Sequence, residues 1–167
     1  MAVVNGTIFS ANGSSGTGFP LLGTAAADTL NANWSAGSDW MFGGAGNDEY
    51  RVNSTGDVVA EASGNGTDTI ASRLASYTLA SNFENLTLDN TAGFLTALNG
   101  TGNSANNVIT GNSNDNILTG LGGNDTIIAG LGDDTLIGGA GKDTMTDGGG
   151  ADVYDFNATS ESAVGVN

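Results

Sequence analysis

A nine-residue repeat runs without interruption from Gly102 to Asp155, and no other feature limits the possible folds of this chain as strongly. It comprises six units, namely GNSANNVIT, GNSNDNILT, GLGGNDTII, AGLGDDTLI, GGAGKDTMT and DGGGADVYD. The sixth position of each unit is an asparagine or an aspartate: Asn107, Asn116, Asp125, Asp134, Asp143 and Asp152. The eighth position is a large side chain suited to a core: Ile109, Leu118, Ile127, Leu136, Met145 and Tyr154. A carboxylate or carboxamide therefore precedes a core side chain by two residues in every unit.

Each unit predicts a tight turn followed by a short strand. Its first six residues are rich in glycine, asparagine and aspartate, which tolerate the backbone conformations of turns. Its last three residues alternate polar and apolar side chains and include β-favouring types. Two units then complete one circuit of a flattened coil, and equivalent units of successive circuits stack at the strand spacing of roughly 4.8 Å. The expected fold class is all-β, a right-handed parallel β-helix or solenoid built from nonapeptide repeats.

This stacking brings carboxylates together, with Asp125 beside Asp143 and Asp134 beside Asp152. Two carboxylates about 5 Å apart repel each other by roughly 3 kcal/mol at an effective dielectric constant of about 20. The only basic residue of the regular block is Lys142, so the two acidic rows need another source of positive charge. Ca²⁺ fits, because it accepts about six to eight oxygen ligands and glycine-rich turns let backbone carbonyls approach it. We therefore expect several calcium ions, each held between one turn and the turn one circuit away.

A solenoid without metal is the alternative, in which the aspartates only form turns through side-chain bonds to the backbone. The choice is most open for the first two units, because Asn107 and Asn116 are neutral. These asparagines either form an uncharged ladder or contribute to weak calcium sites, to which Asp115 adds a carboxylate one position earlier.

The last four units also carry glycine at the fourth position. The block thereby resembles the Gly-Gly-x-Gly-x-Asp-x-U-x repeat of the RTX (repeats-in-toxin) family, in which U is a large apolar residue. That resemblance implies a parallel β-roll with calcium ions sandwiched between its turns. The candidate calcium ligands of these four units stand at the second, fourth and sixth positions: Leu121, Gly123, Asp125, Gly130, Gly132, Asp134, Gly139, Gly141, Asp143, Gly148, Gly150 and Asp152.

Fragments of the same repeat appear earlier in the chain, and we take residues 23–71 as a first, less regular β-roll. They are GTAAADTLN (23–31), WSAGSDWMF (34–42), GGAGNDEYR (43–51) and SGNGTDTIA (63–71). Residues 43–51 match the family pattern throughout, whereas the other fragments lack some of its glycines. The candidate calcium ligands of this region are Asp28, Gly37, Asp39, Gly44, Gly46, Asp48, Gly66 and Asp68.

Three further segments complete the expected organisation. Residues 1–22 form an N-terminal lead that caps the first coil with a short edge strand drawn from Val3, Val4, Ile8 and Phe9. Residues 72–101 break the nine-residue period and predict wider coils with a larger core, supplied by Leu79, Phe83, Leu86, Leu88, Phe94, Leu95 and Leu98. Residues 156–167 drop the repeat, and we expect a truncated C-terminal flank in which Phe156 joins Tyr154 as a partial cap.

Composition excludes several classes of function. Eighteen acidic residues face three basic ones, for a formal net charge of −15, which disfavours nucleic-acid partners and anionic membrane surfaces. No apolar run is long enough to span a membrane. The absence of histidine and cysteine excludes His-dependent triads, cysteine nucleophiles and typical zinc sites. We expect no catalysis by this chain, and any catalytic domain would lie outside it.

The expected function follows from the resemblance. RTX-like proteins leave bacterial cells by type I secretion, which fits the lack of a secretory signal peptide at the start of the sequence. High net charge and low hydrophobic density further indicate a chain that becomes ordered only when metal binds. We therefore expect a monomeric calcium-binding module of a secreted protein, which folds on calcium binding and supports an attached domain.

The sequence is also compatible with two alternative functions. One is a module that binds an anionic polysaccharide, similar to the R-modules of alginate epimerases, and the other is a surface-layer or adhesin repeat. For the first, Arg51 and Arg73 offer positive charge, although they are most simply solvated or paired. Trp34 and Trp40 offer rings that could stack on a sugar, although packing is the simpler interpretation.

Overall fold

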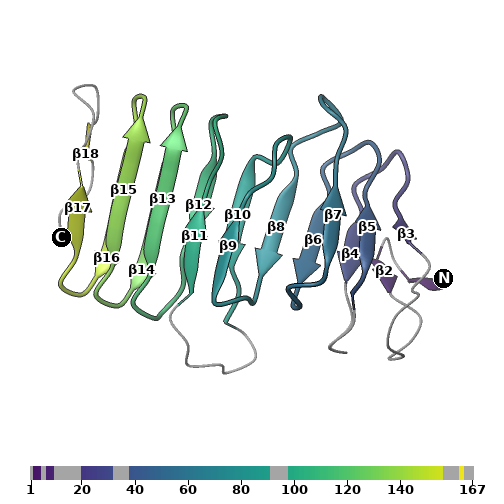
Figure 1. Cartoon of the computed structure of the whole chain (residues 1–167), viewed down its shortest axis with the longest axis horizontal. Coiled ribbons are helices and arrows are strands. Elements are labelled where there is room, and N and C mark those ends of the chain that lie inside the picture. The colour runs from purple at the N-terminus through teal and green to yellow at the C-terminus, as the bar shows by residue number, and fades with distance from the viewer. Residues whose placement is uncertain are drawn as a thin grey trace. The chain divides into compact units, whose positions relative to one another are not determined.

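A computed structural model describes residues 2–4, 7–9, 20–31, 38–90, 98–155 and 162–163. The chain splits into two compact units, Met1–Leu74 and Ala75–Asn167. Both units consist of short strands joined by turns (Figure 1). Within the described ranges there is no helix that could cross a membrane.

The strands of the first unit alternate between two sheets. One sheet has the order β1 (Ala2–Val4), β2 (Thr7–Phe9), β4 (Thr29–Asn31), β6 (Glu49–Val52) and β8 (Thr69–Ser72). The other has the order β3 (Leu21–Leu22), β5 (Trp40–Phe42) and β7 (Val58–Ala60). Neighbouring strands are parallel except β1 and β2, which pair antiparallel. The single edge strand expected near the N-terminus is therefore two strands, of which β2 continues the sheet.

The second unit repeats this alternation over ten strands of the described ranges. One face has the order β10 (Asn85–Leu88), β12 (Val108–Thr110), β14 (Thr126–Leu131), β16 (Thr144–Gly149) and β18 (Ser162–Ala163). The opposite face has the order β9 (Ser76–Thr78), β11 (Asn99–Thr101), β13 (Ile117–Gly122), β15 (Thr135–Ala140) and β17 (Val153–Asp155). All of these neighbours pair in parallel, and β13 and β15 can be followed side by side in Figure 1.

The register of the regular block confirms the two predicted inner walls. Ile109 pairs with Ile127 and Ile127 with Met145 on one face. On the other face Leu118 pairs with Leu136, which pairs in turn with Tyr154. All of these side chains are fully buried except Tyr154, which is half-buried. Parallel pairing around an apolar interior makes each unit a parallel β-roll, the fold class that the repeat predicted.

The coils lengthen where the nine-residue period is broken. Hydrogen bonds between successive coils join residues 18 apart in the regular block and 23 apart near its start. This part of the chain contributes buried Leu79, Phe83, Leu86, Leu88 and Leu98 to the core. Phe94, Leu95 and Phe156, which were also assigned to packing, lie outside the described residues.

Candidate metal sites in the turns

The sixth-position side chains form a ladder that links successive coils. In each step the backbone N–H of one sixth-position residue donates to Oδ1 of the aspartate one coil later. The steps of the second unit are Asn107 to Asp125 (2.7 Å), Asn116 to Asp134 (2.7 Å), Asp125 to Asp143 (2.8 Å) and Asp134 to Asp152 (2.8 Å). Those of the first unit are Asp28 to Asp48 (2.8 Å) and Asp48 to Asp68 (2.9 Å). The predicted stacking of carboxylates in rows is thereby confirmed.

The ladder leaves the second oxygen of several aspartates without a partner. Asp48, Asp125 and Asp134 are only 2%, 2% and 1% exposed, and none of their Oδ2 atoms makes a hydrogen bond within the protein. A carboxylate oxygen removed from water loses its hydration, so leaving it unpaired is costly. These three atoms therefore require a partner from outside the chain.

Oxygens from two coils converge at the first glycine of a regular turn. A Cβ atom built on Gly120 would come closer than 3.0 Å to Oδ2 of Asp125 and to the carbonyl oxygen of Gly138, one coil later. At Gly138 itself, such an atom would meet Oδ2 of Asp143. Glycine keeps this space open, and two acceptors facing one space suit a hard cation that prefers oxygen ligands. The first-position glycines were not among the residues expected from the sequence to form the sites.

The electrostatics of the ladder also favour a cation. Burial raises the pKa of Asp125 to about 6, against the hydrogen bond from Asn107, and the charge of Asp143 raises it further. Burial likewise raises the pKa of Asp134 and Asp48, with added contributions from neighbouring carboxylates. A raised carboxyl pKa means that the surroundings disfavour the charged form. A bound cation would reverse that preference.

The two asparagines of the ladder have partners for both atoms of the amide. The Nδ2 group of Asn107 donates to the carbonyl of Phe83 at 3.2 Å, and that of Asn116 donates to the carbonyl of Leu98 at 2.8 Å. Their Oδ1 atoms accept backbone N–H groups from Asn103 at 2.7 Å and Asn112 at 2.9 Å. This pairing meets the requirement of an uncharged ladder, and weak calcium binding by these two units stays a prediction.

The candidate ligands at the second and fourth positions shape the turns. They adopt positive φ angles at Gly44, Gly46, Gly123, Gly130, Gly132, Gly139, Gly141, Gly148, Gly150 and Leu121. Leu121 is the one non-glycine residue of this set, with a φ of 78°. Gly66 is not in the set, although nearby Gly64 has a φ of 80°. Gly37 lies outside the described residues.

The remaining aspartates expected to bind calcium in the first unit are also buried. Asp28 and Asp68 belong to the same row as Asp48, whereas Asp39 belongs to the other row. Asp28 and Asp39 are 6% and 7% exposed, and Asp68 is 2% exposed. In contrast to Asp48, Asp28 has protein donors on Oδ2, because the backbone N–H and the hydroxyl of Thr24 bond to it at 2.6 and 2.9 Å.

Asp57, which was not expected from the sequence, continues the ladder of the first unit. Its Oδ1 accepts the backbone N–H of Asp39 at 3.1 Å, eighteen residues earlier. Its Oδ2 accepts the N–H groups of Asn53 and Ser54 at 3.1 and 3.0 Å. Residues 52–60 are therefore a degenerate repeat unit. The spacing of eighteen residues between Asp39 and Asp57 is the sequence feature that could have identified it.

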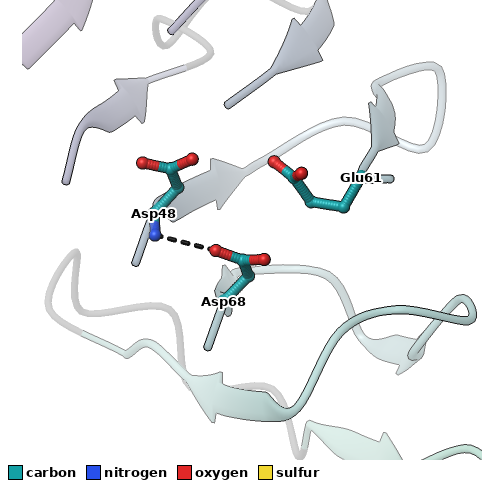
Figure 2. A group of neighbouring side chains, drawn as sticks. All are labelled: Asp48, Glu61 and Asp68. Carbon is teal, nitrogen blue, oxygen red and sulfur yellow. Dashed lines mark hydrogen bonds between the residues drawn. The ribbon is translucent and has the colours of Figure 1, made fainter. Parts of the chain in front are cut away.

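Glu61 is a second unexpected acidic residue, and it joins two members of the ladder. Asp48, Glu61 and Asp68 each offer one carboxylate oxygen, and these atoms lie within 4.8 Å of one another (Figure 2). Burial raises the pKa of Glu61, and the charges of Asp68 and Asp48 raise it further. Glu61 lies between recognisable repeat units, so the repeat spacing did not assign it to a site.

Comparison with protein families agrees with this geometry. A model of the RTX calcium-binding nonapeptide repeat matches four copies in this chain, at residues 21–50, 101–136 and 128–158, which together cover more than half of it. The chain belongs to this family, and its β-roll is a structural calcium-binding module rather than a catalytic one. Comparisons with curated proteins and with solved structures found no match. The unpartnered Oδ2 atoms and the open space at Gly120 fit the calcium ions that the family implies.

Proposed function

We propose that this chain is a calcium-dependent folding module of a secreted bacterial protein, which folds outside the cell and supports an attached domain. One observation carries the proposal: Asp48, Asp125 and Asp134 each bury a carboxylate oxygen that the protein leaves without a partner. The same side chains hold successive coils together through Oδ1. Each of these aspartates would therefore both bind calcium and join two successive coils.

This dual role couples metal binding to folding. Oδ1 of Asp125 accepts a backbone N–H from the previous coil, while Oδ2 and the carbonyl of Gly138 would hold the ion. Bound Ca²⁺ supplies positive charge to rows of carboxylates that repel each other in its absence. Because the site exists only when two coils are stacked, the free energy of binding contributes to the free energy of folding.

The coupling suits export. Free calcium is scarce in the bacterial cytosol, so the acidic rows would keep the chain unfolded and able to thread through a secretion channel. Extracellular modules bind calcium with dissociation constants on the order of 10⁻⁴ to 10⁻³ M, which external calcium saturates. Folding at the exit would also oppose backward movement of the chain. Membership of a family typical of secreted bacterial proteins supports this location.

A calcium titration followed by circular dichroism tests the proposal. The full chain should lack β-sheet signal in chelator and gain it cooperatively as calcium is added. Magnesium should substitute poorly, because it demands small octahedral sites and loses water reluctantly. A chain that is already fully β-structured in chelator would reject the coupling.

A second candidate function is binding of an anionic polysaccharide. Two of the three basic residues of the sequence, Arg51 and Arg73, line one cavity together with Asn31 and Asn53. Guanidinium and amide groups are suited to sugar carboxylates and hydroxyls. The charge of Arg51 is partly offset, because its Nε donates to Glu49 at 2.8 Å. Calorimetry with alginate at saturating calcium should give heat that Arg73→Gln removes, and no heat in the parent chain would exclude this function.

A further inference from the structure

In the first unit, one turn begins with Glu61, whereas the equivalent turn one coil earlier begins with Gly43. Strand pairing aligns the last residues of β5 and β7, so Gly43 and Glu61 are the equivalent first residues of successive turns. Residues 61–67 form a turn that is two residues longer than the one formed by residues 43–47. A glycine can offer an ion only its carbonyl, whereas Glu61 adds a carboxylate.

The longer turn folds this carboxylate back onto the ladder. Figure 2 shows the side chains of Asp48, Glu61 and Asp68 gathered from three segments of the chain, and one oxygen of each lies within 4.8 Å of the others. Their Oδ1 bonds fix the two aspartates, since Asp48 accepts the N–H of Asp28 and Asp68 accepts that of Asp48. Asp48 is 2% exposed, and its Oδ2 has no hydrogen-bond partner.

The side chains of Asp48, Tyr50 and Glu61 meet beside Gly43. A Cβ atom built on Gly43 would come closer than 3.0 Å to Oδ2 of Asp48, the hydroxyl of Tyr50 and Oε1 of Glu61. The Tyr50 hydroxyl donates to Oε1 of Glu61, which also accepts the N–H of Gly43 at 3.1 Å. Tyr50 is fully buried, so it holds the glutamate in place from inside the roll.

We propose that Asp48, Glu61 and Asp68 form a three-carboxylate site for a divalent cation, in which Glu61 supplies a side-chain ligand that lies outside the repeat. The donors from Gly43 and Tyr50 are neutral, so they do not balance three negative charges. A hard cation balances them and partners Oδ2 of Asp48 at the same time. This inference rests on the proposed calcium binding of the turn at Asp48, and it adds a ligand and a rank order of affinity.

The third carboxylate should make this the tightest site of the first unit. Calcium affinity rises with the number of charged ligands. The neighbouring turn at Asp28 lacks an equivalent glutamate, since Gly23 stands at the first position there and Thr24 already occupies Oδ2 of Asp28. Trivalent lanthanides gain even more from three negative charges, so Tb³⁺ is a suitable probe.

Glu61→Gln is the decisive variant for the full chain. Glutamine keeps an acceptor for Gly43 and Tyr50, so a residue that only braces the turn would tolerate the change. Glu49→Gln is the matched control, because it removes the same charge from a side chain next to Asp48 that pairs with Arg51 instead. Glu61→Gly serves as a second variant that removes the carboxylate without adding bulk. Circular dichroism at saturating calcium checks that each variant folds.

Calorimetry with calcium and luminescence titration with Tb³⁺ give the readout. Both Glu61 variants should weaken one binding step about tenfold or more, whereas Glu49→Gln should leave every step unchanged. Affinities in the Glu61 variants equal to that of Glu49→Gln would overturn the inference. Asp125→Asn, which removes a ligand of the second unit, separates the two proposals. If it weakens a different step while Glu61→Gln changes none, only this inference fails, and if no variant or parent chain binds either ion, the proposed function fails too.

Discussion

The backbone N–H of Asp125 donates a 2.8 Å hydrogen bond to Oδ1 of Asp143, one coil later. Asp125 repeats the pattern toward the previous coil, where its own Oδ1 accepts the N–H of Asn107. An aspartate such as Asp125 therefore accepts a backbone N–H with Oδ1 and presents Oδ2 to the turn, where a calcium ion would bind. A substitution that changes only Oδ2 can separate metal binding from coil stacking.

Asp134→Asn should lower calcium-dependent stability without removing the ladder. The amide oxygen can still accept the N–H of Asn116, but an N–H₂ group replaces the buried Oδ2. Loss of a charged ligand should reduce the free energy of unfolding in calcium by roughly 1.5–3 kcal/mol, measured by urea denaturation. Asp133→Asn removes the same charge from the exposed neighbour and should cost far less. Equal losses in the two variants would assign the effect to net charge and not to ligation.

The metal-free chain should become less stable as the pH rises. The pKa of Asp125 in the folded chain is about 6, against an ordinary value of 3.8, so the folded state binds this proton more tightly than the unfolded state. Its contribution is fully present below about pH 4 and is lost, by roughly 3 kcal/mol, as the pH passes through about 6. Calcium competes with the proton, so calcium affinity should increase over the same interval.

The β-sheet signal by circular dichroism in chelator, and calcium titration, both at several pH values, measure the two effects. Asp125→Asn should flatten part of each profile, because it removes the titrating group. A β-sheet signal of the metal-free parent chain that increases between about pH 4 and about pH 6 would contradict the prediction.

The fold was predictable because the repeat period fixes the stacking. A spacing of nine residues decides that Ile109, Ile127 and Met145 share one wall, and the register confirms it. Local sequence also predicts the turns, since glycine occupies most positions with positive φ. These features depend only on residues close together in the chain.

The site was less predictable because it depends on pairings between coils of unequal length. Glu61 becomes a neighbour of Asp48 only through the alignment of β5 with β7. In the same way, the partner of the Asn107 amide is Phe83, which belongs to the wider coil. Where the period breaks, sequence spacing no longer indicates which residues lie side by side.

Adjacent glycines in one turn should differ sharply in their tolerance of alanine. Gly123 has a φ of 108°, and its Cβ would come within 2.4 Å of the carbonyl oxygen of Ala105 and 2.5 Å of its carbon. Gly122 has ordinary space, with the nearest atom 3.8 Å away. Gly123→Ala should therefore lower the free energy of unfolding by roughly 2 kcal/mol or more, through strain and displacement of the coil. Gly122→Ala should change it by less than about 1 kcal/mol in urea denaturation with calcium. Similar losses would show that the turns adjust more freely than this stacking implies.

Asn107→Asp should make the first coils of the regular block more dependent on calcium. The Nδ2 group of Asn107 donates to the carbonyls of Phe83 and Glu84 at 3.2 and 3.3 Å, and aspartate would place an oxygen against both. It would also set a new negative charge one coil before Asp125. At the lowest calcium concentration that still folds the parent chain, the variant should lose about 2–3 kcal/mol or more of its free energy of unfolding. At saturating calcium, it should recover most of that loss and show a steeper calcium dependence, because a carboxylate is a stronger calcium ligand than a neutral amide.

Asn106→Asp is the matched control for this prediction, since it makes the same chemical change at the exposed neighbouring residue. Its side-chain oxygen accepts the backbone N–H of Asn124, and aspartate can keep that bond. Urea denaturation of both variants, at saturating calcium and at the lowest calcium concentration that still folds the parent chain, separates the effect of the charge from the effect of its position. If the two variants are equally stable at the lower concentration, the donors of the Asn107 amide contribute nothing to the stability of these coils.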